Sequence, residues 1–189
     1  MTIKMRLLAL LPLLILLLLP QCSKSTVTVN VDILSFFEEE DKDLEYGEDP
    51  VIPGYGPEIS VKSPIEVISV PEEMSSNGII EEIFILFGLD VANETGQAQA
   101  EFKVYACAKD LNPFLTPPIL AEELILEPDS SYLLEMTVEG DDRLYQLFTQ
   151  DEIYFAVEVL LQPGESTEDI KGVMLMEELK ALVAVSSSF

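Results

Sequence analysis

The sequence predicts an all-β protein: a single antiparallel β-sandwich with an immunoglobulin-like layout, preceded by an N-terminal signal helix. Two observations indicate this fold class. Apolar and polar residues alternate with a period of two in roughly seven to nine short segments, as they do in strands with one buried face. Connections rich in proline and glycine join these segments, and little of the chain has the periodicity of a helix.

The longest alternating pattern runs from Ile79 to Lys109 and predicts one β-hairpin. Its first arm is apolar at odd positions and its second arm at even positions, with turn residues at 93–96 between them. A four-residue loop places Phe87 opposite Phe102. A three-residue loop would place Phe87 opposite Lys103 and turn one arm inside out. Burial therefore favours the first register, with the two phenylalanines facing each other in the core.

Composition narrows the range of functions. The formal net charge is −25, with 35 acidic and 10 basic residues. The negative electrostatic field of such a chain repels phosphate groups and disfavours nucleic acid as a partner. The chain has no histidine, which removes the Ser-His-Asp triad and His-bound zinc, and its two cysteines cannot form a four-thiolate site. We therefore expect no catalytic residue, no cofactor and no enzymatic activity.

Residues 1–21 have the organisation of a signal peptide. Lys4 and Arg6 precede an apolar run from Leu7 to Leu19, which is too short for an ordinary membrane span, and Cys22 follows closely. This arrangement resembles a bacterial lipoprotein leader, in which the cysteine just after the apolar run is lipidated and becomes the mature N-terminus. The resemblance implies lipidation at Cys22 and a membrane-anchored lipoprotein that faces the periplasm or the cell surface.

Ordinary cleavage after Ser25 is the alternative, because Ser23 and Ser25 form a small-x-small site; the protein would then be secreted. Either way the chain leaves the cytoplasm. If Cys22 carries lipid, Cys107 has no intramolecular disulfide partner. Cys107 is out of phase with the apolar positions of its strand, so we expect it to point away from the core.

The mature chain is divided into a segment 22–57 and the remainder of the sandwich, 58–189. The first strand is expected at Ser25–Phe37. The run Glu38–Asp49 contains eight acids and one lysine, and is predicted to be a flexible loop that continues through proline and glycine to residue 57. Three of its acids alternate and are weak candidates for calcium ligands: Asp41, Asp43 and Glu45. The Gly and Glu that an EF-hand needs at its sixth and twelfth places are missing, so no metal site is predicted.

Four more strands and one helical turn are expected before the last segment. The strands are predicted at 59–69, 119–126, 132–138 and 153–161, and a helical reading stays open for 121–124. Pro64 within the first of them indicates an edge strand or a bulge. Asp141 is expected to cap a helical turn that buries Leu144, Leu147 and Phe148.

The last segment, Ile170 to Val185, is ambiguous between strand and helix. Its composition favours helix, whereas its odd positions, Val173 and Leu175 among them, alternate as in a strand. We predict two short strands around a bulge at Glu177-Glu178.

These features lead to two hypotheses about function. The first is an exported, lipid-anchored β-sandwich module with a non-enzymatic binding or structural role in the bacterial cell envelope, which binds an envelope protein or polymer by its loops or a sheet edge. The alternative is a carboxylate-based extracellular hydrolase of a polymer such as a polysaccharide. A concave cleft with two carboxyl groups ~5–10 Å apart would favour the hydrolase.

Overall fold

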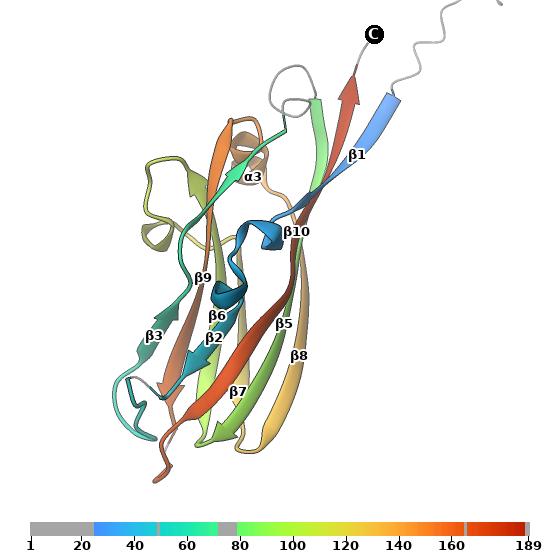
Figure 1. Ribbon diagram of the computed structural model, residues 1–189. Coiled ribbons are helices and arrows are strands. Elements are labelled where there is room, and N and C mark those ends of the chain that lie inside the picture. The colour runs from blue at the N-terminus through green and yellow to red at the C-terminus, as the bar shows by residue number, and fades with distance from the viewer. Residues whose placement is uncertain (1–24, 49, 72–78, 165, 188–189) are drawn as a thin grey trace, which may run out of the picture.

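The computed structural model describes residues 25–48, 50–71, 79–164 and 166–187, which form a sandwich of two antiparallel sheets (Figure 1). The first sheet contains β1 (Ser25–Asp32), β2 (Asp43–Tyr46), β5 (Ile79–Thr95), β8 (Ser130–Glu139) and β10 (Lys171–Ser187). The second sheet contains β3 (Ile59–Lys62), β4 (Glu66–Ser69), β6 (Ala98–Ala108), β7 (Leu120–Leu126) and β9 (Glu152–Pro163). The short helices are η1 (Leu34–Phe36), η2 (Glu39–Asp41), η3 (Pro113–Leu115) and α3 (Asp142–Leu147). The prediction of an all-β sandwich is confirmed.

The strand order defines the kind of sandwich. The first sheet runs β1-β10-β5-β8, with β2 on the same edge of β10 as β1, and the second runs β3-β9-β6-β7, with β4 beside β3 on β9. When β1 and β2 are counted as one position beside β10, and β3 and β4 as one position beside β9, every connection except β6 to β7 carries the chain from one sheet to the other. This is the order of a jelly roll, not the immunoglobulin-like layout, in which several hairpins stay within one sheet.

The predicted hairpin from Ile79 to Lys109 is wrong, because its two arms lie in different sheets. Phe87 pairs with Met136 and Leu179, whereas Phe102 pairs with Glu122 and Val159. The turn between the arms, with Gly96 at φ +68°, passes from one sheet to the other. Alternation shows which face of a strand is buried but not which strand lies beside it. Both phenylalanines are fully buried in the core, each supplied by its own sheet.

The acidic segment contains a strand where a flexible loop was predicted. Residues 43–46 pair with β10, and Leu44 and Tyr46 are buried while the alternating Asp43 and Glu45 are exposed. Two acids of the charge run, Asp43 and Glu45, therefore form the outer face of a short amphipathic strand. Two apolar side chains at alternate positions are enough to hold it against the core.

Residues 171–187 form one long strand, and the expected bulge at Glu177 is present. Pairing with β5 shifts between Met176 and Glu178. The bulge also reverses which positions are buried: Met174 and Met176 are buried before it, and Leu179 after it. The prediction that Val173 and Leu175 face the core is wrong for this reason, since an extra residue changes the face that the following side chains occupy.

The break at Pro64 has the same effect. Lys62 pairs with Glu158 and Glu66 with Phe155, so four steps along the edge strand match three along β9. As a result Ile68 is buried, while Val67 is exposed. The predicted strands 119–126, 132–138 and 153–161 and the capped turn at Asp141 are confirmed. No helix within the described ranges has the length and apolar character needed to cross a membrane.

Candidate functional site

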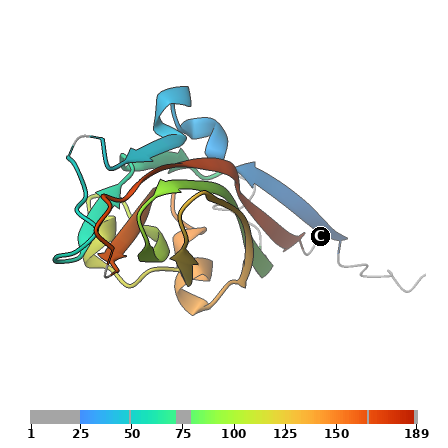
Figure 2. The same ribbon diagram turned by 90° about the horizontal axis from the view of Figure 1, so that it is seen from below.

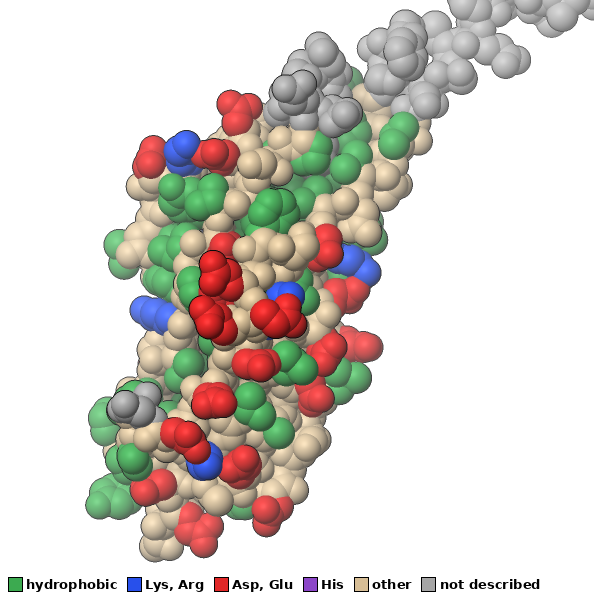
Figure 3. All heavy atoms as spheres, in the orientation of Figure 1, with side chains coloured by type: hydrophobic (Ala, Val, Ile, Leu, Met, Phe, Trp, Pro, Cys, Tyr) green, Lys and Arg blue, Asp and Glu red, His purple; other side chains and the backbone are tan. Residues whose placement is uncertain are grey.

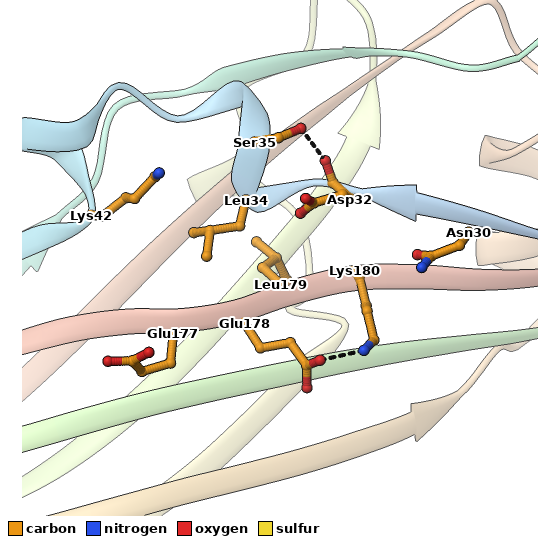
Figure 4. A pocket seen from close by; sticks show the side chains of 9 residues that line it. All are labelled: Asn30, Asp32, Leu34, Ser35, Lys42, Glu177, Glu178, Leu179 and Lys180. Carbon is orange, nitrogen blue, oxygen red and sulfur yellow. Dashed lines mark hydrogen bonds and ion pairs between the residues drawn. The ribbon is translucent and has the colours of Figure 1, made fainter.

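A hollow of about 440 Å³ lies on the edge of the first sheet, where β1 gives way to β2 (Figure 4). We call it the edge hollow. Its lining comes from β1, η1, β10 and the residue before β2: Asn30, Asp32, Leu34, Ser35, Lys42, Glu177, Glu178, Leu179 and Lys180.

The edge hollow exists because two short strands share one edge of β10 without meeting. β1 ends with Asp32 paired to Lys180, and β2 begins with Asp43 paired to Leu175. Residues 33–42 leave the edge between these pairs and form η1 and η2. Among the described residues, no strand pairs with 176–179 on this side of β10. A single backbone bond crosses here, from the Met176 amide to the Lys42 carbonyl (3.0 Å).

Residues 33–42 are held in place by apolar side chains on either side of η1. Ile33 and Phe37 flank η1 and are buried in the core. The opposite wall is fixed by the bulge in β10, because bulges reorient side chains at sheet edges. Gly88 of β5 faces the bulge, and a Cβ there would lie 3.2 Å from the Glu178 Cβ. Core residues therefore fix one wall of the hollow, and packing against β5 fixes the other. The shape of the hollow follows from the fold.

The electrostatics of the edge hollow combine both signs of charge. Glu178 forms an ion pair with Lys180, and the Lys42 ammonium lies 2.8 Å from Glu39 outside the hollow. Within the described residues, the carboxylates of Asp32 and Glu177 have no ion-pair partner. Three carboxylates against two ammonium groups leave the lining with an excess of negative charge. The site can attract an amine and still offer hydrogen bonds to a polar chain.

The weak metal candidates do not converge on this hollow. Asp41 lies in η2, whereas Asp43 and Glu45 alternate along the exposed face of β2. No three acidic, histidine or cysteine side chains in the described part of the chain are arranged to hold a metal ion. Cys22, the predicted lipidation site, lies outside the described residues.

A second polar cluster, on the outer face of the second sheet, was missed from the sequence. Glu158 is 7% exposed, and its carboxylate accepts hydrogen bonds from Tyr105 (2.6 Å) and Ser60 (2.7 Å) and an ion pair from Lys62 (3.3 Å). Burial alone would raise the pKa of Glu158, but these three partners outweigh it and hold the pKa below its usual range. Burial and the nearby Glu158 carboxylate raise the pKa of Tyr105, so the phenol stays a donor.

This cluster fastens the η3 loop to the sheet. The Phe114 ring meets the Tyr105 ring edge-on at 5.5 Å, and the Lys62 ammonium lies 4.6 Å from its centroid. Such contacts are worth about 0.5–1.5 kcal/mol each. The only sign in the sequence was one glutamate inside the apolar run of β9.

Cys107 belongs to the same outer face. It is 3% exposed and lies outside the core cluster, as its phase predicted, and its thiol donates to the Leu111 carbonyl at 3.6 Å. Burial raises the pKa of Cys107 and outweighs the opposing effect of Arg143, which favours the protonated thiol. The cysteine therefore acts as a small packing residue.

A smaller hollow of about 250 Å³ lies further along this face, lined by Glu58, Gln99, Glu101, Glu123, Leu160 and Gln162. Its amides are already engaged, since Gln99 donates to Glu123 at 3.0 Å and Gln162 to the Gly56 carbonyl at 3.5 Å. The edge hollow is larger and lies beside a stretch of β10 that no described strand pairs with on that side, so we take it as the candidate site.

No family model matches the chain, and the curated proteins contain no match. Solved structures of infectious bursal disease virus are similar in fold: the Gx strain has a TM-score of 0.43 at 12% identity and the Gt strain 0.39 at 10%. Each alignment covers 88% of this chain and 38% of the viral chain, so this chain spans well under half of theirs. A structure described as "CBM4 structure and function" has a TM-score of 0.30 at 12% identity over 77% of this chain and 84% of that one. These similarities concern β architecture alone.

Proposed function

We propose that this protein is an exported, lipid-anchored module of the bacterial cell envelope that binds an envelope protein or polymer without catalysing a reaction. Export and anchoring are supported by the leader, with its basic residues, short apolar run and Cys22. Binding takes place at the edge hollow.

One observation carries the binding role: the edge of β10 is left without a strand partner at 176–179, among the described residues, beside a hollow with unpaired carboxylates. Unpaired strand edges are where extended segments of other molecules add to a sheet. Here the flanking strands β1 and β2 limit access to a short stretch. An occupant therefore has to be narrow, extended and polar.

The charges of the lining point to the ligand's chemistry. Asp32 and Glu177 are available to an ammonium group, whereas Lys180 already has Glu178 as its partner. A chain bearing amines, such as a basic peptide segment or the peptide stems of peptidoglycan, fits these groups. Since charge-assisted hydrogen bonds are worth about 1.5–3 kcal/mol, two of them would dominate the affinity.

Co-sedimentation of the lipidated chain with insoluble peptidoglycan, and a binding assay with a basic peptide, test the proposal. We expect saturable binding that Glu177→Gln weakens about tenfold, which corresponds to losing one charged contact of ~1.4 kcal/mol. Glu45→Gln is the matched control, because it removes the same charge from an exposed position on β2 outside the hollow. Equal binding by both variants would exclude the edge hollow as the site.

Mass spectrometry of the mature N-terminus tests the anchor. A diacyl or triacyl modification on Cys22 is the expected result. An unmodified N-terminus at Thr26 would exclude lipidation and leave export in place.

The second candidate function is the polymer hydrolase, favoured by the two unpaired carboxylates at one hollow. Hydrolysis of a glycosidic bond needs one carboxyl as acid and another as base or nucleophile. Release of reducing ends from soluble polysaccharides, abolished by Asp32→Asn and by Glu177→Gln, would establish it. Saturable binding with no release supports the binding module.

A further inference from the structure

We propose that one end of the first sheet rests directly on the lipid surface, so that the sandwich stands upright on the membrane. This end consists of residues 25–31 of β1, 79–83 of β5 and 181–187 of β10, and we call it the charge-poor end. The inference rests on the proposed lipid anchor at Cys22 and adds how the folded domain meets the bilayer.

The tether leaves little freedom. β1 begins at Ser25, only three residues after Cys22. An extended residue spans at most ~3.3–3.6 Å, so the start of the strand lies within about 11 Å of the lipid-bearing residue. Lys24, within this tether, adds a positive charge where anionic headgroups attract it. A folded domain on so short a tether has to touch the surface with the end that carries the tether.

The charge of this end differs from that of the whole chain. Residues 25–31 and 181–187 contain no charged residue, in a protein with 35 acidic and 10 basic residues and a formal net charge of −25. Among the described residues of this end, the acids are Glu81 and Glu82 of β5, and Thr26 donates to the Glu81 carboxylate at 3.4 Å. Figure 3 shows acidic side chains over the body, its upper left included, while the visible surface of the corner where β1 and β10 meet consists of apolar and uncharged atoms. Anionic lipids repel the acidic body, so the charge-poor end is the part that can approach.

The shape of this end fits the same role. β5 pairs with β8 only from Phe84 onward, so β1, β5 and β10 continue beyond the end of β8. Figure 2 shows β1 and the end of β10 projecting from the body. Val27 is 58% exposed and Ile79 is 59% exposed, and their neighbouring register positions place them on opposite faces of the sheet. Apolar side chains on both faces of a projecting edge can enter the headgroup region, which is favourable because it removes apolar area from water.

The opposite end of the sandwich would then face away from the membrane. It carries the connections near residues 47–58, 96–97, 127–129 and 164–170. A strand of 17 residues such as β10 rises about 55 Å, which places these loops far above the lipid. The edge hollow lies part-way up, near the middle of β10, and stays open to the surrounding envelope.

The absence of tryptophan from the chain permits a direct test. Val27→Trp and Ile79→Trp each place one reporter at the charge-poor end, and Tyr55→Trp places one at the far end, where Tyr55 is 72% exposed. The lipidated full chain is reconstituted in vesicles of phosphatidylcholine and phosphatidylglycerol, with and without brominated acyl chains. We expect the fluorescence of the Val27→Trp and Ile79→Trp variants to shift to the blue and to be quenched at least twofold by bromine. The fluorescence of the Tyr55→Trp variant should be unaffected.

Each other outcome has a definite meaning. If the lipidated, vesicle-bound Val27→Trp and Ile79→Trp variants are quenched no more than Tyr55→Trp, the upright contact is overturned and the anchored function stays intact. A chain that carries no lipid overturns the anchor and the contact together. A blue shift that persists without vesicles, with a doubled mass in solution, would show that a second copy covers this end, and would also overturn the proposal.

Discussion

The hydroxyl of Tyr46 donates a 3.0 Å hydrogen bond to Asn93 Oδ1 across an intervening strand. Tyr46 belongs to β2 and Asn93 to β5, and Gly172 of β10 lies between them in the pairing register. A Cβ on Gly172 would lie 2.3 Å from the Tyr46 hydroxyl, so the missing side chain makes room for the phenol. Asn93 also donates 2.9 Å bonds to the carbonyls of Gly96 and Glu127. One buried amide thus joins the acidic strand to two turns.

Replacing this amide should destabilise the whole sandwich. We expect Asn93→Ala to lower the free energy of unfolding by about 2–6 kcal/mol, because it leaves the buried Tyr46 hydroxyl without an acceptor, at about 1–3 kcal/mol, and removes two hydrogen bonds to carbonyls, at about 0.5–1.5 kcal/mol each. Chemical denaturation followed by circular dichroism measures the change. Asn112→Ala is the control, since Asn112 caps the exposed η3 turn with one bond and should cost only about 1 kcal/mol. A loss at Asn93 no larger than at Asn112 would contradict this role.

The core position Phe87 and the outer position Lys103 should respond very differently. Phe87 is 1% exposed, so Phe87→Ala should cost about 3–5 kcal/mol through lost burial and a residual cavity. Lys103 pairs with Glu101 at 2.8 Å on the outer face, so Lys103→Ala should change stability by no more than ~0.5 kcal/mol. Thermal and denaturant unfolding of both variants give the comparison. Similar losses at the two positions would mean that the faces of the sheets are assigned wrongly.

Alternation of side chains was sufficient to predict the strands and their buried faces, but not their partners. Phe87 and Phe102 satisfy the same pattern whether they lie side by side in a hairpin or in opposite sheets. Choosing between these requires the path of β8 and β10, which reach β5 from residues far along the chain. Long-range pairing of this kind has no local signal.

Bulges limited the prediction in a second way. The bulge at Glu177 was expected, but the burial of Met174 and Met176 before it was not. The sequence analysis kept the odd positions buried on both sides of the bulge, whereas a bulge exchanges the buried and exposed positions. The edge hollow depends on the same bulge and on the gap between β1 and β2. The gap could not be predicted, because the many acids of this segment indicated a loop. In the structure Leu44 and Tyr46 are buried and hold a strand there.

Leu44 distinguishes an anchored strand from a loose acidic loop. It is 8% exposed and pairs with Met174, so Leu44→Ala should cost about 2–4 kcal/mol. Amide exchange in residues 43–46 should also be slowed, as expected for paired backbone. Glu45→Ala on the exposed face provides the matched change and should stay within ~0.5 kcal/mol. If Leu44→Ala keeps its full stability, the segment is a flexible loop and not an anchored strand.

The last prediction concerns pH. Because the pKa of Glu158 is lower in the folded state than in the unfolded chain, its ionised form stabilises the fold above the usual range of a glutamate. This contribution disappears as the pH falls through the lowered pKa. Glu158→Gln should therefore cost about 1–3 kcal/mol at neutral pH, since Tyr105, Ser60 and Lys62 lose their charged acceptor. The difference from the unmodified protein should shrink below about pH 4.

Glu66 supplies the control of opposite sign. Burial raises its pKa, and the nearby Asp41 and Glu38 raise it further. An acid with a raised folded pKa destabilises the fold when it is ionised, so stability is gained as the pH falls through that pKa. Glu66→Gln should therefore stabilise the protein at neutral pH, and the gain should vanish in acid. Denaturant midpoints measured from neutral pH to about pH 3 for both variants should show differences from the unmodified protein that have opposite signs and converge in acid. If both glutamine variants are destabilised alike at neutral pH, the two carboxylates do not have the environments described.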